Sequence, residues 1–186
     1  MRITGGAARG RPLRAPRGLR VRPTADKVRA AIFNILATRT DIAGQRWLDL
    51  FAGSGALGLD ALSRGATHVT FIDESRESCG FVRENAERSG FAGCVEIRRM
   101  ALPAGLRRLR VGERFDGAFV DPPYRRGLAD RTLGALGDGS LLAPAAWVVA
   151  EHEAREALAE RYGRLSLRDS RRYGSTGISL YAMEGQ

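Results

Sequence analysis

Residues 119–127 read FVDPPYRRG and combine an acid, two prolines and an aromatic residue in four consecutive positions. Pro fixes φ and donates no backbone hydrogen bond, so Pro122 and Pro123 cannot extend the preceding apolar strand. They hold their neighbours, Asp121 and Tyr124, in one rigid geometry. The Asp121 carboxylate and the Pro122 carbonyl are then two adjacent hydrogen-bond acceptors, a pair that suits an exocyclic –NH2 group.

This acceptor pair predicts methylation of an amine on a nucleobase. Accepting both N–H bonds localises the lone pair on nitrogen, and in-line positioning then favours attack on a sulfonium methyl group. Tyr124 can stack on the base, a contact worth about 1–3 kcal/mol. We interpret Asp121, Pro122, Pro123 and Tyr124 as catalytic. The alternative is a turn that only ends a strand, with Tyr124 as ordinary packing.

A glycine loop supplies the second candidate site. Gly53, Gly55 and Gly58 have GxGxxG spacing between a predicted strand and a predicted helix, and Asp73 follows Gly53 by twenty residues. Such glycines let a ligand approach the backbone, the helix start offers free N–H groups, and the acid can bind ribose hydroxyls. Nicotinamide and flavin sites share this pattern, as does a turn that only packs a helix on a strand. No Gly-Lys-Ser/Thr follows, so a P-loop is excluded.

Two features favour S-adenosylmethionine over a dinucleotide. Asp49 precedes the loop and could receive the ammonium of the cofactor's amino-acid portion, directly or through water. An anionic pyrophosphate would find this carboxylate a poor neighbour. The second feature is the DPPY turn itself.

Basic residues are concentrated at the start of the chain. The net charge is +9 over 186 residues, and residues 1–30 hold eight Arg and one Lys against one acid. We interpret this segment as an arm for phosphate contact rather than as a solvated face. The arginines expected to bind RNA are Arg2, Arg9, Arg11, Arg14, Arg17 and Arg22, with Arg126 beside the DPPY turn.

Composition bounds the class of protein. The chain is 44% hydrophobic and 27% charged, as in ordinary globular proteins. No apolar run approaches the length of a membrane span, and the N-terminus has no apolar signal segment. Cys79 and Cys94 are far apart and the two histidines are isolated, so we expect free thiols, no metal site and a cytoplasmic, monomeric protein.

Strand and helix patterns alternate along the chain. Alternation of this kind predicts a Rossmann-like α/β fold whose mainly parallel sheet has helices on both faces. In the first predicted helix, Thr24 is the expected N-cap and Val28, Ala31, Ile32, Ile35 and Leu36 form an apolar face. The expected strands are 46–53, 67–74, 94–99, 115–124 and 146–153, with a hairpin in 163–183. The expected helices are 22–37, 56–66, 75–90, 127–138 and 154–163.

The chain resembles the RsmD-type 16S ribosomal RNA (guanine(966)-N(2))-methyltransferases, class I enzymes with a [DN]PP[YF] motif. The resemblance implies a seven-stranded sheet, with residues 1–22 as a small hairpin arm for RNA and 23–186 as the methyltransferase domain. It also implies S-adenosylmethionine as the cofactor and 16S rRNA in the assembling small subunit as the substrate. The stretches that carry it are ITGGAARGRPL, RPTADKVRAAIFNIL, DLFAGSGALGLDALSRGA and FVDPPYRRG.

The same resemblance assigns residues to the cofactor. Many relatives have Asp or Asn where this chain has Met100, so adenine is expected to be held by backbone groups near Ala101 and by apolar contact. The expected cofactor-binding residues are Asp49, Phe51, Gly53, Ser54, Gly55, Asp73, Glu74, Met100 and Ala101.

Three other functions compete with this one. A DNA adenine-N6 or cytosine-N4 methyltransferase has a similar motif but needs a target-recognition domain, for which 186 residues leave little room. A nicotinamide-dependent oxidoreductase would share the glycine loop and Asp73 but leaves the DPPY turn without a role. A non-catalytic RNA-binding protein explains the charge but not the presence of Asp121.

Overall fold

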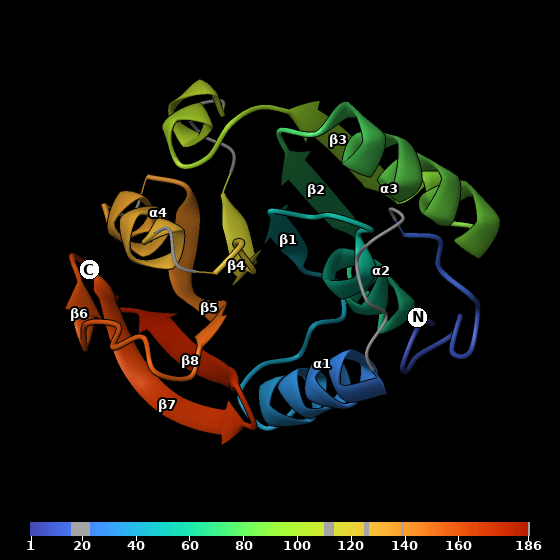
Figure 1. Cartoon of the computed structure of the whole chain (residues 1–186). Helices are drawn as coiled ribbons and strands as arrows, with labels where there is room; N and C mark the ends of the chain where they lie inside the picture. Colours follow the sequence, from blue (N-terminus) through green and yellow to red (C-terminus); the bar gives the residue numbers. More distant parts are fainter. Residues whose placement is uncertain (16–22, 110–113, 125–126, 139, 186) are drawn as a thin grey trace. The chain divides into compact units, whose positions relative to one another are not determined.

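Strands and helices alternate along the chain as the sequence predicts (Figure 1). The chain divides into two compact units, Met1–Met100 and Ala101–Gln186, so residues 1–15 belong to the same unit as the glycine loop. The computed structural model describes residues 1–15, 23–109, 114–124, 127–138 and 140–185.

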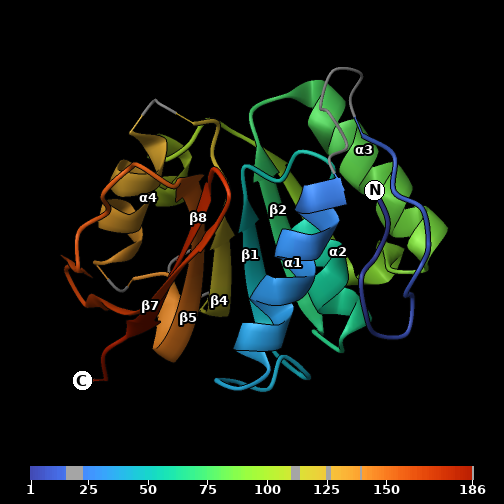
Figure 2. The same ribbon diagram turned by 60° about the horizontal axis from the view of Figure 1, so that its bottom comes forward.

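The first unit is a three-stranded parallel sheet with helices packed on it. Its strands follow the order β3-β2-β1, with α3 against β2 and β3 (Figure 1) and α2 against β1 and β2 (Figure 2). Trp47, Leu48, Phe71 and Ile72 are almost completely buried, as expected for strands covered on both faces. The elements are α1 (Pro23–Leu36), β1 (Arg46–Leu50), α2 (Ala56–Ser63), β2 (His68–Asp73), α3 (Arg76–Ser89), the 3-10 turn Ala92–Cys94 and β3 (Val95–Arg99).

Helix termini in this unit follow the sequence signals. Ser75 is the N-cap of α3 and its side chain accepts the Ser78 N–H at 3.2 Å, while Gly90 closes the helix in the left-handed conformation. Helix α1 begins at Pro23, one residue before the expected N-cap Thr24. Four residues of its predicted apolar face are buried: Val28, Ile32, Ile35 and Leu36.

The second unit contains five strands in the order β4-β5-β8-β7-β6. Strands β4 and β5 are parallel, and β5, β8, β7 and β6 pair antiparallel. The predicted C-terminal hairpin is therefore confirmed as β7 and β8. The elements are the 3-10 helix Ala104–Arg108, β4 (Phe115–Val120), α4 (Leu128–Leu136), β5 (Leu142–Glu153), β6 (Arg161–Tyr162), β7 (Leu165–Tyr173) and β8 (Thr176–Met183).

The helix predicted for residues 154–163 is wrong. This segment is a turn followed by β6, which makes eight strands in the described residues instead of the expected seven. Its backbone groups have partners outside the segment: the Ala159 carbonyl accepts the Tyr181 hydroxyl at 2.8 Å, and the Glu160 carbonyl accepts the Leu167 N–H at 2.8 Å. Tertiary hydrogen bonding thus overrides the helix propensity of an Ala-, Leu- and Glu-rich stretch.

No helix within the described ranges combines the length and the apolarity that a membrane span requires. Cys79 and Cys94 are free thiols, as predicted, and Cys79 is buried.

Candidate cofactor and acceptor sites

The glycine loop connects β1 to α2 at the carboxyl edge of the first unit's sheet. Leu50 and Ile72 lie opposite each other in parallel strands, so the loop and Asp73 leave the sheet side by side. The Gly53 N–H donates to the Asp73 carboxylate at 2.8 Å. The acid that follows Gly53 by twenty residues in the sequence is therefore hydrogen-bonded directly to the loop.

The three glycines of the motif have different structural roles. A side chain at Gly53 would meet nothing nearer than a carbonyl 3.9 Å away, so its α-carbon faces open space. Gly55 is the N-cap of α2 at φ 77, a conformation that L side chains rarely adopt. A side chain at Gly58 would overlap the ring of Phe71, so Gly58 lets α2 approach β2 closely. Of the three positions, Gly53 alone leaves room for a ligand on the backbone.

Asp73 organises the edge of the sheet and retains acceptor capacity. One carboxylate oxygen accepts the Gly53 N–H and the other accepts the Ser75 N–H, both at 2.8 Å. An ionised carboxylate offers about four lone-pair sites. Two backbone donors leave acceptor sites for the hydroxyls of a ribose, and the side chain is only half-buried. The residue therefore fits the predicted ribose contact.

Asp49 is a buried acid beneath the loop. Its carboxylate is 1% exposed and accepts the Gly58 N–H at 2.8 Å. Burial is the main cause that raises the pKa of Asp49 to about 7, and the nearby negative charge of Asp73 adds to it, against the Gly58 hydrogen bond. A cation near this carboxylate would favour its ionised form.

Phe51 and Ser54 occupy the rest of the loop. Phe51 is half-buried at φ 63, in the left-handed region where a bulky side chain is rare. Ser54 is buried, and its hydroxyl lies 3.2 Å from the Met1 sulfur. The first residue of the basic arm therefore touches the glycine loop.

Three other expected cofactor-binding residues, Glu74, Met100 and Ala101, are only partly free to bind. The Met100 N–H donates to the Asp73 carbonyl at 3.1 Å, which continues the pairing of β2 with β3. That donor is thus engaged in the sheet, so Met100 offers its half-buried side chain instead. Glu74 and Ala101 are exposed, and Ala101 begins the second unit.

The DPPY turn leaves the end of β4 in the second unit, as predicted. Strand β4 ends at Val120, and in the following residues Asp121 is half-buried, Pro122 is buried and Pro123 is exposed. Among the large hydrophobic residues in the described ranges, Tyr124 is the exposed one, with 38% of its surface accessible. An exposed aromatic ring beside a rigid proline turn is available for stacking on a planar ligand.

The hydroxyl of Tyr124 is anchored although its ring is exposed. It donates to a Glu151 carboxylate oxygen at 3.0 Å and lies 3.2 Å from the Thr176 hydroxyl. Desolvation, followed by the charges around it, raises the pKa of Tyr124 well above its ordinary value. The phenol therefore stays neutral, and its hydroxyl is bonded to residues of β5 and β8. The sequence-based interpretation did not include these two contacts.

The described part of the arm, residues 1–15, is a hairpin-like loop. The Ile3 N–H donates to the Arg11 carbonyl at 3.0 Å, and the Leu13 N–H donates to the Met1 carbonyl at 3.1 Å. Ile3 and Leu13 are buried, so the arm is fastened to the first unit. Its predicted RNA-binding side chains that are described and exposed are Arg2, Arg9, Arg11 and Arg14. Arg17, Arg22 and Arg126 lie outside the described residues.

A buried ion-pair cluster also fastens the arm, and sequence reasoning missed it. Arg29 and Asp60 are 5% and 0% exposed, and the Arg29 Nε lies 2.5 Å from an Asp60 carboxylate oxygen. Asp60 also accepts hydrogen bonds from Arg64 and from the N–H and hydroxyl of Thr4. The available signal was an acid, Asp60, inside an otherwise apolar helix.

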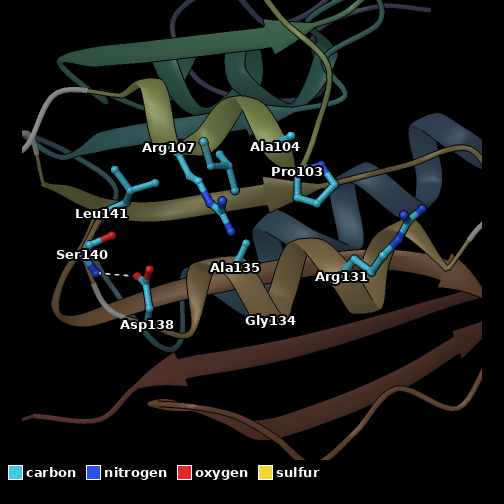
Figure 3. A pocket seen from close by; sticks show the side chains of 10 residues that line it. Pro103, Ala104, Arg107, Arg131, Gly134, Ala135, Asp138, Ser140 and Leu141 are labelled. Atoms are coloured by element: carbon cyan, nitrogen blue, oxygen red, sulfur yellow. Dashed lines mark hydrogen bonds between the residues drawn. The ribbon is translucent and has the colours of Figure 1, made fainter.

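The second unit also contains an open cavity of about 640 Å³ between the 3-10 helix and α4 (Figure 3). Arg107 and Arg131 line it together with Asp138, so its charge is mixed. None of the residues around it belongs to the predicted site, and the remaining lining is Pro103, Ala104, Leu106, Gly134, Ala135, Ser140 and Leu141.

The parallel strands, the glycine loop on Asp73 and the DPPY turn are together the features of a Rossmann-like methyltransferase. The family described as "Conserved hypothetical protein 95" matches residues 1–182. The chain belongs to this family, which is that of the RsmD-type methyltransferases.

The chain matches individual relatives over its full length. Ribosomal RNA small subunit methyltransferase D of Escherichia coli (strain K12) is 38% identical over 188 residues, which cover 100% of this chain and 91% of that protein. YlbH of Bacillus subtilis (strain 168) is 36% identical over 189 residues, all of both chains. The solved structure of yhhF from Escherichia coli has a TM-score of 0.83 at 38% identity and covers 100% and 99% of the two chains. The predicted family resemblance and fold class are thereby confirmed.

Proposed function

We propose that the protein transfers a methyl group from S-adenosylmethionine to the exocyclic N2 amine of one guanine in 16S ribosomal RNA, at the position called 966 in the family. When bound, the cofactor supplies a methyl group on a positively charged sulfur; an N–C bond forms as the S–C bond breaks, and one proton is released. The chain's own residues bind, orient and activate the two partners.

The first unit holds the methyl donor in this proposal. Open space over Gly53 and the spare acceptor sites of Asp73 fit the backbone approach and the ribose hydroxyls of the cofactor. Asp49, although buried, supplies negative charge beneath the loop for the ammonium. Phe51, Ser54, Gly55, Glu74, Met100 and Ala101 complete the proposed cofactor set.

The second unit holds the acceptor. Asp121 and the Pro122 carbonyl accept the two N–H groups of the guanine amine, which localises its lone pair for attack. The Asp121 carboxylate can also accept the released proton. Tyr124 stacks on the base while Glu151 and Thr176 fix its hydroxyl. Pro123 contributes rigidity and is not expected to touch the reacting atoms.

The RNA substrate is supported by the relatives and by charge. The Escherichia coli relative is named ribosomal RNA small subunit methyltransferase D. Exposed arginines on the fastened arm, Arg9 and Arg11 among them, provide phosphate contacts that give affinity without reading sequence. The net charge of +9 agrees with a polyanionic partner.

One observation carries the proposal furthest: the exposed ring of Tyr124 next to Asp121, with its hydroxyl anchored behind it. An aromatic ring held at the surface beside two hydrogen-bond acceptors can stack on a nucleobase, a contact worth about 1–3 kcal/mol. A dehydrogenase gives the DPPY turn no role, and a non-catalytic RNA-binding protein could use the stacking ring but has no need of Asp121 beside it.

The test is methyl transfer from labelled S-adenosylmethionine to small ribosomal subunits that lack their native methylations. Free 16S rRNA and duplex DNA serve as parallel acceptors. We expect label in the rRNA of the subunits, at a single N2-methylguanine found by nuclease mapping. Label in DNA alone would instead assign the protein to the DNA amino-methyltransferases, and binding of the cofactor without transfer to any acceptor would refute the proposed substrate.

A further inference from the structure

Asn85 lies in the second half of α3, and its side chain is completely buried. A buried amide needs partners for its donors and its oxygen. The Asn85 Nδ2 donates to the Ser54 carbonyl at 2.9 Å and to the Arg14 carbonyl at 2.8 Å. Its Oδ1 accepts the Arg14 N–H at 2.8 Å. One side chain thus has both of its ends committed to two other segments of the chain.

These two segments are the two ligand-binding parts of the first unit. Ser54 stands between Gly53 and Gly55 in the cofactor loop, and Arg14 belongs to the basic arm. The amide pairs with both backbone groups of Arg14, as a neighbouring β-strand would, and so fixes the direction of the arm at that point. Asn85 is therefore a joint between the loop that binds the cofactor and the arm that binds RNA.

Other contacts make the joint stiff. The Met1 sulfur lies 3.2 Å from the Ser54 hydroxyl, a second link between arm and loop. The Arg14 guanidinium lies 2.9 Å from the carboxylate of Glu84, the neighbour of Asn85 on α3. Leu13 is buried beside this point. A change in the order of the loop therefore reaches the arm through direct contacts rather than through the bulk of the sheet.

We propose that Asn85 is a positioning residue that couples cofactor binding to RNA binding. A cofactor bound on the loop acts on the Ser54 carbonyl and therefore on the Asn85 amide, which holds both backbone groups of Arg14. The arm is then held in the direction that RNA contacts, and RNA bound first favours the cofactor by the same factor. This inference rests on the proposed function.

The experiment measures the affinity of S-adenosylhomocysteine, the demethylated product and a non-reacting probe, with and without undermethylated small subunits. The ratio of the two dissociation constants is the coupling factor. We expect about tenfold for the parent protein, within the usual range for coupled sites. Asn85→Ala should reduce the factor to within about twofold of one.

A matched control uses a second buried polar residue of the same helix. Ser89 lies one turn beyond Asn85, is 4% exposed, and its hydroxyl has no hydrogen-bond partner in the described chain. Ser89→Ala should keep the parent coupling factor. Loss of coupling in Ser89→Ala as well would mean that any disturbance of α3 has this effect, and would overturn the assignment to Asn85.

A second pair of variants tests the joint from the arm, at a residue whose own side chain is exposed, with thermal unfolding measured alongside. Arg14→Ala removes the guanidinium but keeps the N–H that Asn85 accepts, whereas Arg14→Pro removes that N–H as well. Both should weaken RNA binding. Only Arg14→Pro should lower the coupling factor to near one.

The outcomes separate this inference from the proposed function. Independent binding of probe and subunits to the parent protein would refute the coupling and leave the methyltransferase proposal standing. Parent-like coupling in both Asn85→Ala and Arg14→Pro would refute the role of Asn85. A parent protein that binds the probe but no subunits would contradict the proposed substrate, and with it this inference.

Discussion

Tyr124 allows the ring and the hydroxyl of one side chain to be tested separately. Tyr124→Phe removes the hydrogen bonds to Glu151 and Thr176 but keeps the ring. Tyr124→Ala removes both. If the ring stacks on the target base, the second substitution should cost far more activity than the first.

The magnitudes follow from the contacts. A hydrogen bond of this kind contributes about 0.5–1.5 kcal/mol net, and the 38% exposure of Tyr124 places this pair at the lower end. Tyr124→Phe should therefore reduce kcat/KM for the RNA by no more than about fivefold. Stacking contributes about 1–3 kcal/mol per base, so Tyr124→Ala should lose roughly a further 5- to 150-fold.

The assay is kcat/KM at limiting RNA, with the dissociation constant of the cofactor and thermal unfolding as controls. Both controls should stay near the parent values, because Tyr124 belongs to the second unit and is not among the proposed cofactor residues. Equal losses in the two variants would show that the hydroxyl and not the ring matters. Parent-like activity of Tyr124→Ala would refute stacking at this position.

Three further predictions concern the arm, Asp49 and the loop glycines. Replacing Arg9 and Arg11 by Ala should weaken RNA binding and flatten its salt dependence by about 0.7–0.9 per lost phosphate contact, with cofactor affinity unchanged; an unaltered salt slope would remove these arginines from the account. Because the pKa of Asp49 is raised to about 7, its folded state holds a proton that the unfolded chain releases near pH 4, so its contribution to the free energy of unfolding falls as pH rises between about 4 and about 7. Asp49→Asn should remove this slope of at most about 1.4 kcal/mol per pH unit, measured by urea unfolding at several pH values, and identical slopes in both proteins would contradict it. Gly53 has a φ of 54, so Asn, which tolerates the left-handed conformation, is the suitable replacement there. Gly53→Asn should abolish cofactor binding in calorimetry with a modest loss of stability, whereas Gly58→Val should chiefly destabilise the fold by overlapping the Phe71 ring; the reverse pattern would exchange their assigned roles.

Local patterns predicted the parts of the fold whose signals lie close together in sequence. The GxGxxG spacing located the loop between β1 and α2, the acid Asp73 was found at the end of β2, and Gly90 closed α3 as expected. These features depend on short-range stereochemistry: left-handed glycines, N-caps and apolar strands. The two prolines after Val120 likewise marked the end of β4.

Features that depend on distant partners were missed. The segment 154–163 has the composition of a helix, and only the Tyr181 hydroxyl and the Leu167 N–H, far along the chain, explain its extended course. Asn85 carries no special pattern in a polar stretch of α3, and its three hydrogen bonds appear only when residues 14, 54 and 85 meet. The anchoring of Tyr124 by two later strands was hidden for the same reason.

The central claim is that the Asp121 turn activates the guanine amine, and turnover of Asp121→Ala tests it most directly. The variant should bind cofactor and RNA close to the parent affinities and unfold at a similar temperature. Its kcat should fall by roughly 100-fold or more, the loss seen when one preorganised hydrogen-bond partner of a reacting group is removed. Asp121→Asn keeps one acceptor oxygen, so its kcat should lie between those of the parent protein and Asp121→Ala. Turnover of Asp121→Ala at the parent rate would contradict the account.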